Sequence, residues 1–174
     1  MTYQIRQGRI EDVKAIAGVE AECFPAAEAA NEDSLKKRLT AFPECFFVAE
    51  EVKDGCPQEI IGFINGAAVD CQKICDEMFE DVSWHKKDGR YQSIFGLDVA
   101  KKARRQGVAA ALMNRMIEEA KKQGRDGVIL TCKDKLIHYY EKFGYQNLGV
   151  SASVHGGAVW YDMILEFGKG RDKV

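Results

Sequence analysis

Residues 93–124 constrain the fold most, because strand, loop and helix signals follow one another there without a gap. The first part, from Ile94 to Val99, is rich in apolar and β-branched side chains, which favour a half-buried strand. A short basic loop, residues 101–107, comes next. Apolar side chains then recur every three or four positions as far as Ala120, which predicts an amphipathic helix. Gly124 follows at the position where a helix commonly ends with a residue in the left-handed conformation. The sequence therefore predicts a strand, a basic loop and an amphipathic helix in succession.

The junction between the basic loop and this helix has the chemistry of an anion site. The first N–H groups of a helix have no intrahelical partner and carry the positive end of the helix dipole. Gly107 and Ala109 leave room for a pyrophosphate to approach these groups, and Arg104 and Arg105 add positive charge. The alternative interpretation is a surface turn whose cations are simply solvated.

Two short motifs carry a resemblance to a known family. Residues 104–109, R-R-Q-G-V-A, resemble the Q/R-x-x-G-x-G/A acyl-CoA pyrophosphate loop of the GNAT acetyltransferase superfamily. Residues 139–145, Y-Y-E-K-F-G-Y, resemble the second landmark of that superfamily. Together with residues 97–107, they are most similar to the arylalkylamine (serotonin) N-acetyltransferase branch, and a looser similarity reaches back to Cys23-Phe24-Pro25.

The resemblance implies acetyl-CoA as co-substrate and assigns roles to particular positions. Backbone groups of Leu97 and Val99 would hold the pantetheine arm and polarise the thioester carbonyl. Tyr140 would act as proton or hydrogen-bond donor to the thiolate of CoA as it leaves. The loop that contains Phe24 and Pro25 would cover the acceptor amine. The full set of positions expected to contact acetyl-CoA is Leu97, Asp98, Val99, Arg104, Arg105, Gln106, Gly107, Val108, Ala109, Ala110 and Tyr140.

The expected role of Tyr140 has an energetic limit. A phenol with a pKa near 10 is a weaker acid than a thiol near 8.5, so complete proton transfer to the thiolate is uphill by about 2 kcal/mol. We therefore expect Tyr140 to act mainly as a hydrogen-bond donor. Its neighbour Tyr139 is expected to be a core residue.

The proton acceptor is where the sequence departs from the arylalkylamine branch. An alkylamine with a pKa of about 10.4 is neutral in only about one molecule in a thousand at pH 7, a handicap of about 4–5 kcal/mol that a base would help to remove. The branch carries a His-x-His pair where this chain has Ser93 and Phe95. The catalytic candidates are therefore His85 in the preceding loop and Ser93 acting with water and backbone groups. Weaker carboxylate candidates are Glu22, Glu28 and Asp70.

Strand and helix signals alternate along the rest of the chain. They predict an α/β fold, with a mixed, mostly antiparallel central sheet and helices on both faces. The further expected strands are residues 3–5, 46–49, 60–64, 128–131, 146–150 and 158–167, with a turn at Asp54-Gly55. The further helices are one that begins near Ile10 and ends before Phe24, and residues 31–40, 70–82 and 136–143.

Composition narrows the class of protein. A chain of 174 residues suits one domain, residues 1–174. The net charge of −2 argues against nucleic acid as a partner. There is no apolar run long enough to span a membrane and no signal-peptide pattern, and six cysteines without an export signal suggest reduced thiols in the cytoplasm. No spacing typical of a metal site is present.

These observations leave three functional hypotheses. The first is an acetyl-CoA-dependent N-acetyltransferase of a small primary amine, with arylalkylamines as one candidate class, in a protein that could form a homodimer. An acidic segment from Asp70 to Asp81 would attract a cationic amine by its negative charge. The same residues would also suit the solvent-exposed face of an amphipathic helix. The second hypothesis is an acetyltransferase of proteins or peptides, and the third is a non-catalytic acyl-CoA-binding domain.

Overall fold

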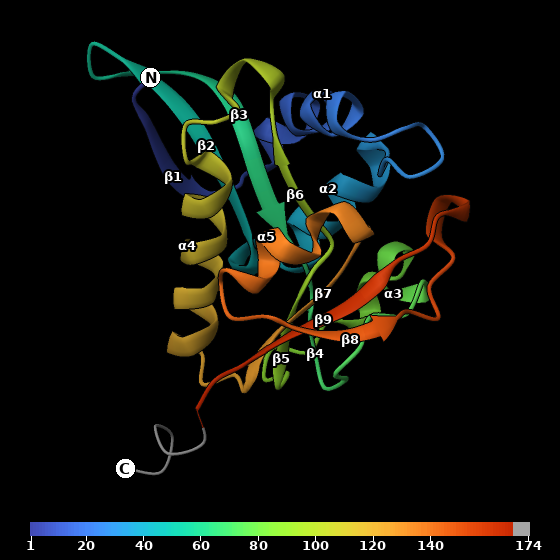
Figure 1. Ribbon diagram of the computed structural model, residues 1–174. Helices are drawn as coiled ribbons and strands as arrows, with labels where there is room; N and C mark the ends of the chain where they lie inside the picture. Colours follow the sequence, from blue (N-terminus) through green and yellow to red (C-terminus); the bar gives the residue numbers. More distant parts are fainter. Residues whose placement is uncertain (169–174) are drawn as a thin grey trace. The chain divides into compact units, whose positions relative to one another are not determined.

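The computed structural model describes residues 1–168, which form two compact units. The first unit comprises residues 1–66 and 96–116, and the second comprises residues 67–95 and the chain from residue 117 onward. Each unit has its own β-sheet (Figure 1). The single domain expected from chain length, residues 1–174, stays a prediction.

The first unit is built on a four-stranded antiparallel sheet with the order β1-β2-β3-β6. Its strands are β1 (Tyr3–Gln7), β2 (Phe46–Lys53), β3 (Cys56–Asn65) and β6 (Gly96–Val99), and its helices are α1 (Val13–Cys23) and α2 (Glu32–Ala41), together with short 3-10 turns at Ile10–Asp12, Pro43–Cys45 and Lys101–Ala103. Helix α4 (Val108–Lys122) begins in this unit and ends in the second.

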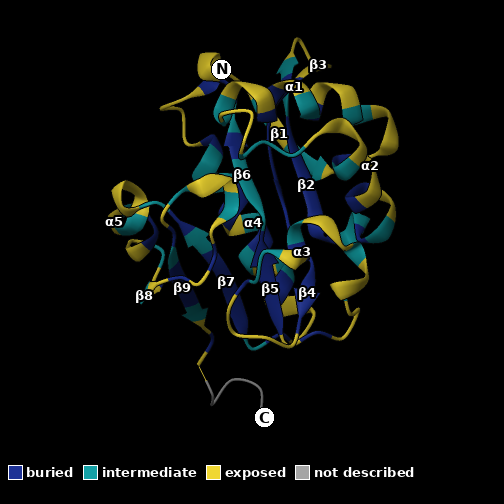
Figure 2. Ribbon diagram, turned by 90° about the vertical axis from the view of Figure 1, so that its right-hand side faces the viewer, coloured by how far each residue is buried: buried dark blue, intermediate teal, exposed yellow. Residues whose placement is uncertain are grey.

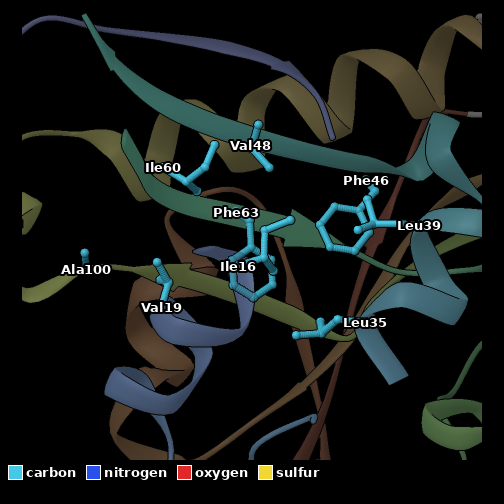
Figure 3. Close-up of a cluster of buried hydrophobic side chains, with 9 residues drawn as sticks. All are labelled: Ile16, Val19, Leu35, Leu39, Phe46, Val48, Ile60, Phe63 and Ala100. Atoms are coloured by element: carbon cyan, nitrogen blue, oxygen red, sulfur yellow. The ribbon is translucent and has the colours of Figure 1, made fainter. Parts of the chain in front are cut away.

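Helices cover both faces of this sheet. On one face, α1 and α2 pack on β2 and β3 around a buried apolar cluster (Figure 3). Its members are Ile16, Val19, Leu35, Leu39, Phe46, Val48, Ile60, Phe63 and Ala100. On the other face, a Cβ atom added to Gly62 would lie 3.3 Å from the side chains of Val108 and Leu112, and the Arg115 guanidinium lies 4.8 Å from the centre of the Phe47 ring. Because neighbouring strand residues alternate between faces, α4 lies opposite α1 and α2.

The second unit is built on a five-stranded sheet with the order β4-β5-β7-β9-β8. Strands β5 and β7 are parallel, and every other pair in it is antiparallel. The elements are β4 (Ala68–Val69), α3 (Glu77–Glu80), β5 (Tyr91–Ile94), β7 (Gly127–Cys132), α5 (Ile137–Glu141), β8 (Gln146–Val150) and β9 (Tyr161–Glu166), with 3-10 turns at Val82–Trp84, Asp134–Leu136 and His155–Gly157. Strands β5 and β7 are mostly buried, whereas β8 at the sheet edge is largely exposed (Figure 2).

Several local predictions are confirmed. The fold is α/β with mixed, mostly antiparallel sheets flanked by helices. The Asn31 side chain accepts a hydrogen bond from Ser34 N and caps α2. Asp54 and Gly55 have φ angles of 52° and 75°, as a two-residue hairpin turn between β2 and β3 requires. Gly124, with φ of 74°, follows α4 in the left-handed region.

Two element predictions are wrong. The strand expected over residues 94–99 is interrupted at Phe95, so that β5 pairs within the second unit and β6 within the first. Apolar and β-branched residues occur on both sides of the break, and strand propensity does not specify the partner strand. The helix expected over residues 70–82 is reduced to α3 and a 3-10 turn. Side chains of Asp70 and Asp76 instead accept hydrogen bonds from Arg90 N and Val154 N, and Asp81 caps the 3-10 turn by accepting from Ser83 N, which competes with helical hydrogen bonding.

Among residues 1–168, none of the helices combines the length and the apolar character that crossing a bilayer requires.

Candidate active site

The Arg104–Ala109 loop of the first unit has the backbone geometry of an anion site. The φ angle is positive at Arg105 (64°) and Gly107 (80°) but not at Gln106 between them. Alternation of this kind turns successive N–H groups toward one side and forms a concave anion-binding arrangement. A Cβ atom added to Gly107 would have no neighbour within 4 Å, so the glycine faces open space.

The first turn of α4 adds further donors to this loop. The first bond of the helix runs from Ala111 N to Gly107 O at 3.0 Å. The N–H groups of Val108, Ala109 and Ala110 therefore have no acceptor within the helix. They lie at the positive end of the dipole of a helix of 15 residues, where a phosphate is favoured.

The two arginines of the loop differ in their surroundings. Arg104 Nε donates to Val99 O at 3.1 Å, and its Nη2 lies 3.6 Å from Cys23 Sγ. Arg104 thus joins the loop to the end of β6 and to α1. The exposed Arg105 has no such bond among the described residues and is the cation best able to meet an anion.

The end of β6 presents backbone groups at a sheet edge. Strand β6 is the last strand of its sheet, and Ala100 N donates to Ile61 O on β3 at 2.8 Å. Since the direction of backbone hydrogen bonding alternates along an antiparallel strand, the N–H and C=O groups of Leu97 and Val99 point away from β3. Val99 O accepts bonds from Arg104 and from the Cys23 thiol. The edge near Leu97 has the geometry to pair with an extended, amide-containing chain.

Asp98 points away from this edge. Its side chain is 1% exposed and faces α1 and α2, where Glu20, Arg38 and Asn65 are also buried. Burial, with the neighbouring Glu20 carboxyl, raises the pKa of Asp98 well above its usual value, and Arg38 opposes the shift. Asp98 is expected to contact acetyl-CoA, but its side chain is buried and its backbone N–H and C=O point toward β3, so this orientation does not favour such a contact. Sequence analysis did not identify this buried polar group.

Tyr140 lies on α5 in the second unit and is 8% exposed. Its ring makes edge-on contacts with Tyr139 and Tyr145, with centroids 5.2 and 5.8 Å away. Burial raises the pKa of Tyr139 and of Tyr145, the latter strongly, so both phenols stay protonated. The Tyr140 ring is thus held by aromatic neighbours on both sides, which suits a side chain that must be oriented.

Ser93 and His85 are both engaged within the second unit. The Ser93 hydroxyl is fully buried and donates to Ala67 O at 2.6 Å. His85 Nδ1 accepts a hydrogen bond from Ala68 N at 3.0 Å. The two bonds fix the segment before β4 and β5, which gives each side chain a structural role and does not favour either as a proton acceptor.

Two of the carboxylates suggested by sequence, Glu22 and Asp70, also make local contacts. Glu22 Oε1 accepts from Lys101 N at 3.2 Å. Asp70 binds Lys86 Nζ at 2.9 Å, and the hydrogen bond from Lys86 is the main reason that the pKa of Asp70 is lowered. Asp76 accepts from Ser153 Oγ and from Val154 N. The acidic segment is therefore not the solvent-exposed face of a long helix. Its Asp70 and Asp76 carboxylates instead make hydrogen bonds to other parts of the chain.

The Phe24-Pro25 segment begins the loop after α1. Phe24 N donates to Glu20 O and ends the helix, and Pro25 O accepts from the N–H groups of Glu28 and Ala29. The side chain of Phe24 is half-buried and Pro25 is exposed. Ala30 N, at the far end of the loop, donates to Glu20 Oε2 at 2.7 Å. The loop is thereby tied to α1 at both ends.

Comparison with known proteins identifies the family. The family model described as the acetyltransferase (GNAT) family matches residues 13–145, which include the Arg104–Ala109 loop and Tyr140. The chain belongs to the GNAT acetyltransferase family. Its class as a GNAT-type N-acetyltransferase, predicted from the two motifs, is confirmed.

Individual GNAT proteins are distant in sequence but close in fold. A serotonin N-acetyltransferase of Mesocricetus auratus is 26% identical over 157 residues, covering 88% of this chain and 72% of that protein, and it supports the resemblance to that branch. The GNAT-like decarboxylase GphF, solved with isobutyryl-CoA, superposes with a TM-score of 0.77 at 18% identity, covering 94% of this chain and 98% of the other. Ard1 of Thermoplasma volcanium gives a TM-score of 0.73 at 18% identity, covering 97% and 100%. These two structures support the GNAT fold.

Proposed function

We propose that this GNAT protein transfers the acetyl group of acetyl-CoA to the primary amine of a small molecule. The observation that carries the proposal is the anion cradle formed by alternating φ angles at Arg105 and Gly107 and the free N–H groups of α4. A pyrophosphate fits this cradle because no side chain blocks Gly107. The outward backbone groups of Leu97 and Val99 suit the amides of a pantetheine arm.

The chain's own groups would act at three points of the reaction. The thioester supplies the activated acetyl group, which the neutral amine attacks directly. Backbone N–H at the β6 edge would stabilise the negative charge that develops on the carbonyl oxygen. The Tyr140 hydroxyl would donate a hydrogen bond to the departing thiolate, a contribution that needs no complete proton transfer.

The acceptor is proposed to be small, and an arylalkylamine is the class favoured by the similarity to a serotonin N-acetyltransferase. The loop from Phe24 to Ala30, tied to Glu20 at both ends, supports a covered acceptor site rather than an open groove. A peptide acceptor is the second candidate, because a solved structure of similar fold is that of the NatC complex bound to Gag peptide and CoA. The proposed cytoplasmic location rests on the six cysteines, which are all free thiols.

A thiol-release assay with acetyl-CoA tests the proposal. The panel should contain tryptamine, phenethylamine, a polyamine and short peptides at matched concentrations. We expect turnover with an aromatic amine. Turnover with peptides alone would move the protein to the second candidate, and tight CoA binding without turnover of any amine would favour a non-catalytic acyl-CoA-binding domain.

Replacing Tyr140 with Phe tests its role within this function. We expect kcat to fall by about 100-fold, since a positioned proton donor contributes about that much or more, while CoA affinity measured by calorimetry stays within about twofold. Tyr139→Phe is the matched control, because its neighbouring ring makes similar aromatic contacts. Equal rates in the two variants would remove Tyr140 from the mechanism.

A further inference from the structure

Four polar side chains lie inside the first unit beside its apolar cluster. They come from four elements: Glu20 from α1, Arg38 from α2, Asn65 from β3 and Asp98 from β6, with exposures of 6%, 5%, 0% and 1%. Burying charged groups costs free energy unless they pair with one another. Such a group in a small core therefore needs an explanation beyond packing.

The four side chains are only partly paired. Arg38 Nη1 donates to Asn65 Oδ1 at 3.2 Å, and Glu20 Oε2 accepts from Ala30 N at 2.7 Å. Among the described residues, the two carboxyl oxygens of Asp98 and the Asn65 amide nitrogen have no hydrogen-bond partner. Unsatisfied polar atoms at this depth are uncommon in native proteins. Here they converge on one point.

Gly96 marks that point. A Cβ atom added to Gly96 would lie 3.2 Å from Asp98 Oδ1, 3.5 Å from Asn65 Nδ2 and 3.8 Å from Glu20 Oε1. The φ angle of Gly96 is not in the positive region, so the backbone there does not demand glycine. The missing side chain instead leaves space beside the polar atoms. Gly96 is itself half-buried and directly precedes Leu97, whose backbone faces the free edge of β6.

Two carboxyl groups that face one another in a buried site cannot both be ionised, and one of them retains a proton. Asp98 is the group whose pKa is raised well above its usual value, first by burial and then by Glu20. A protonated Asp98 can donate a hydrogen bond to Glu20, and a hydrogen bond from Cys23 opposes the shift. The pair therefore holds one proton and one negative charge, and burial favours the proton on Asp98.

We propose that Glu20, paired with a protonated Asp98, is the proton acceptor for the attacking amine. This inference rests on the proposed function. As the amine nitrogen forms its bond to the acetyl carbon and the carbon–sulfur bond breaks, the Glu20 carboxylate takes the proton that the nitrogen loses. The CoA thiolate, hydrogen-bonded by Tyr140, takes a proton from solvent, and Glu20 returns its proton to solvent. The products are the N-acetylated amine and CoA thiol.

The surroundings of the pair support this assignment. Arg38 on α2 supplies the nearby positive charge, and burial lowers its own pKa to about 10, so that it stays charged at neutral pH. On α1, Cys23 is the other titratable group next to Asp98, and burial raises the pKa of its thiol. Cys23 therefore stays protonated and does not compete as a base. Arg104 contacts this Cys23 thiol, with its Nη2 3.6 Å from the sulfur.

Glu20→Gln is the primary test, with Glu32→Gln, an exposed residue in the first turn of α2, as the control. Protonation of the amine substrate lowers kcat/KM toward acid pH in every variant, and protonation of the acceptor adds a further loss in the wild type. In Glu20→Gln we expect kcat to fall by about 100-fold and this further loss to disappear, so that only the pH dependence of the amine remains, with CoA affinity unchanged. An unchanged rate and pH profile in Glu20→Gln would overturn the inference while leaving the proposed function intact.

Gly96→Ala tests the same site without removing a charge. The added methyl would occupy the space beside Asp98 Oδ1, so we expect a loss of kcat of about tenfold or more with normal CoA affinity. If Glu20→Gln fails to fold, Gly96→Ala is the variant that tests the inference. Full activity of Gly96→Ala would then overturn it. If the wild-type protein binds CoA but acetylates no amine, the proposed function fails, and the inference fails with it.

Discussion

Gly107 is the residue at which backbone conformation and ligand binding are most directly linked. Its φ of 80° is disfavoured for any side chain, and its position faces open space in the proposed pyrophosphate cradle. We expect Gly107→Ala to lose about 1 kcal/mol of folding stability and at least about tenfold in CoA affinity, the latter because a methyl group or a shifted loop would obstruct the N–H groups. Calorimetry and thermal unfolding measure the two effects.

Gly55 provides a matched control for this substitution. It has a φ of 75°, lies in the same unit and also has no atom within 4 Å of an added Cβ. Gly55→Ala should therefore show a similar loss of stability and unchanged CoA affinity. If both variants bind CoA as the wild type does, the Arg104–Ala109 loop is not the pyrophosphate site.

Residue patterns predicted the positions of glycines and caps better than the orientation of polar side chains. Gly107 and Asn31 act within a few residues of themselves, so local sequence is enough to place them. Asp98 is different, because in Leu-Asp-Val the acidic residue would ordinarily face solvent, yet here it is the fully buried position. A signal was present in α1, where Glu20 follows Ile16 by four residues and so lies on its apolar face.

At the scale of elements, Arg6 ties β1 to β2 and to the turn before α1. Its guanidinium donates two bonds to Asp12, at 2.8 and 2.9 Å, and two to Glu50, at 3.2 and 3.0 Å. For Asp12, burial raises the pKa, but the Arg6 hydrogen bonds and other lowering effects prevail, and for Glu50 the Arg6 hydrogen bond is the main lowering cause. Both carboxylates therefore have a lower pKa in the folded chain than in the unfolded one.

Removing Arg6 should destabilise the fold in a pH-dependent way. Groups with a lowered folded pKa contribute stability above their unfolded values of 3.8 and 4.5, and this contribution is lost as the pH falls through the folded values. We expect Arg6→Met to cost about 2 kcal/mol at pH 7 and progressively less between about pH 5 and pH 2, as measured by urea unfolding. Lys37→Met, which breaks a solvent-exposed pair with Asp33, should cost under about 0.5 kcal/mol. A pH-independent cost for Arg6→Met would contradict the assignment.

The sequence predicted the bounds of helices and strands well where local residues determine them. It predicted them poorly where they depend on contacts with residues far away in the sequence. Helix α2, Glu32–Ala41, lies within one residue of the expected range 31–40 at each end. The segment from Asp70 to Asp81 has helical apolar spacing, but Asp70 binds Arg90 N and Asp76 binds Val154 N, from parts of the chain far away in sequence. Likewise, the break at Phe95 depends on which strands β5 and β6 pair with, and pairing partners cannot be deduced from the propensity of either segment.

At the scale of the whole molecule, the remaining question is whether the two units unfold together, as the prediction of one domain requires. The chain passes from the first unit to the second between Met116 and Ile117, within α4, so that one continuous helix belongs to both. Both tryptophans of the protein, Trp84 and Trp160, lie in the second unit, whereas the Arg104–Ala109 loop lies in the first. Tryptophan fluorescence therefore reports unfolding of one unit, while the proposed pyrophosphate contacts are in the other.

We expect CoA to stabilise both units equally. At a concentration of about 100 times its Kd, a ligand that binds only the folded protein adds about 2.7 kcal/mol, which raises the Tm of a chain of this length by about 5–10 °C. In a single cooperative transition, tryptophan fluorescence and far-ultraviolet circular dichroism should give the same Tm, shifted by the same amount. Gly107→Ala should reduce both shifts in parallel at the same CoA concentration. A fluorescence transition that stays in place while part of the dichroism signal moves would show that the units unfold independently, and the single-domain prediction would then be wrong.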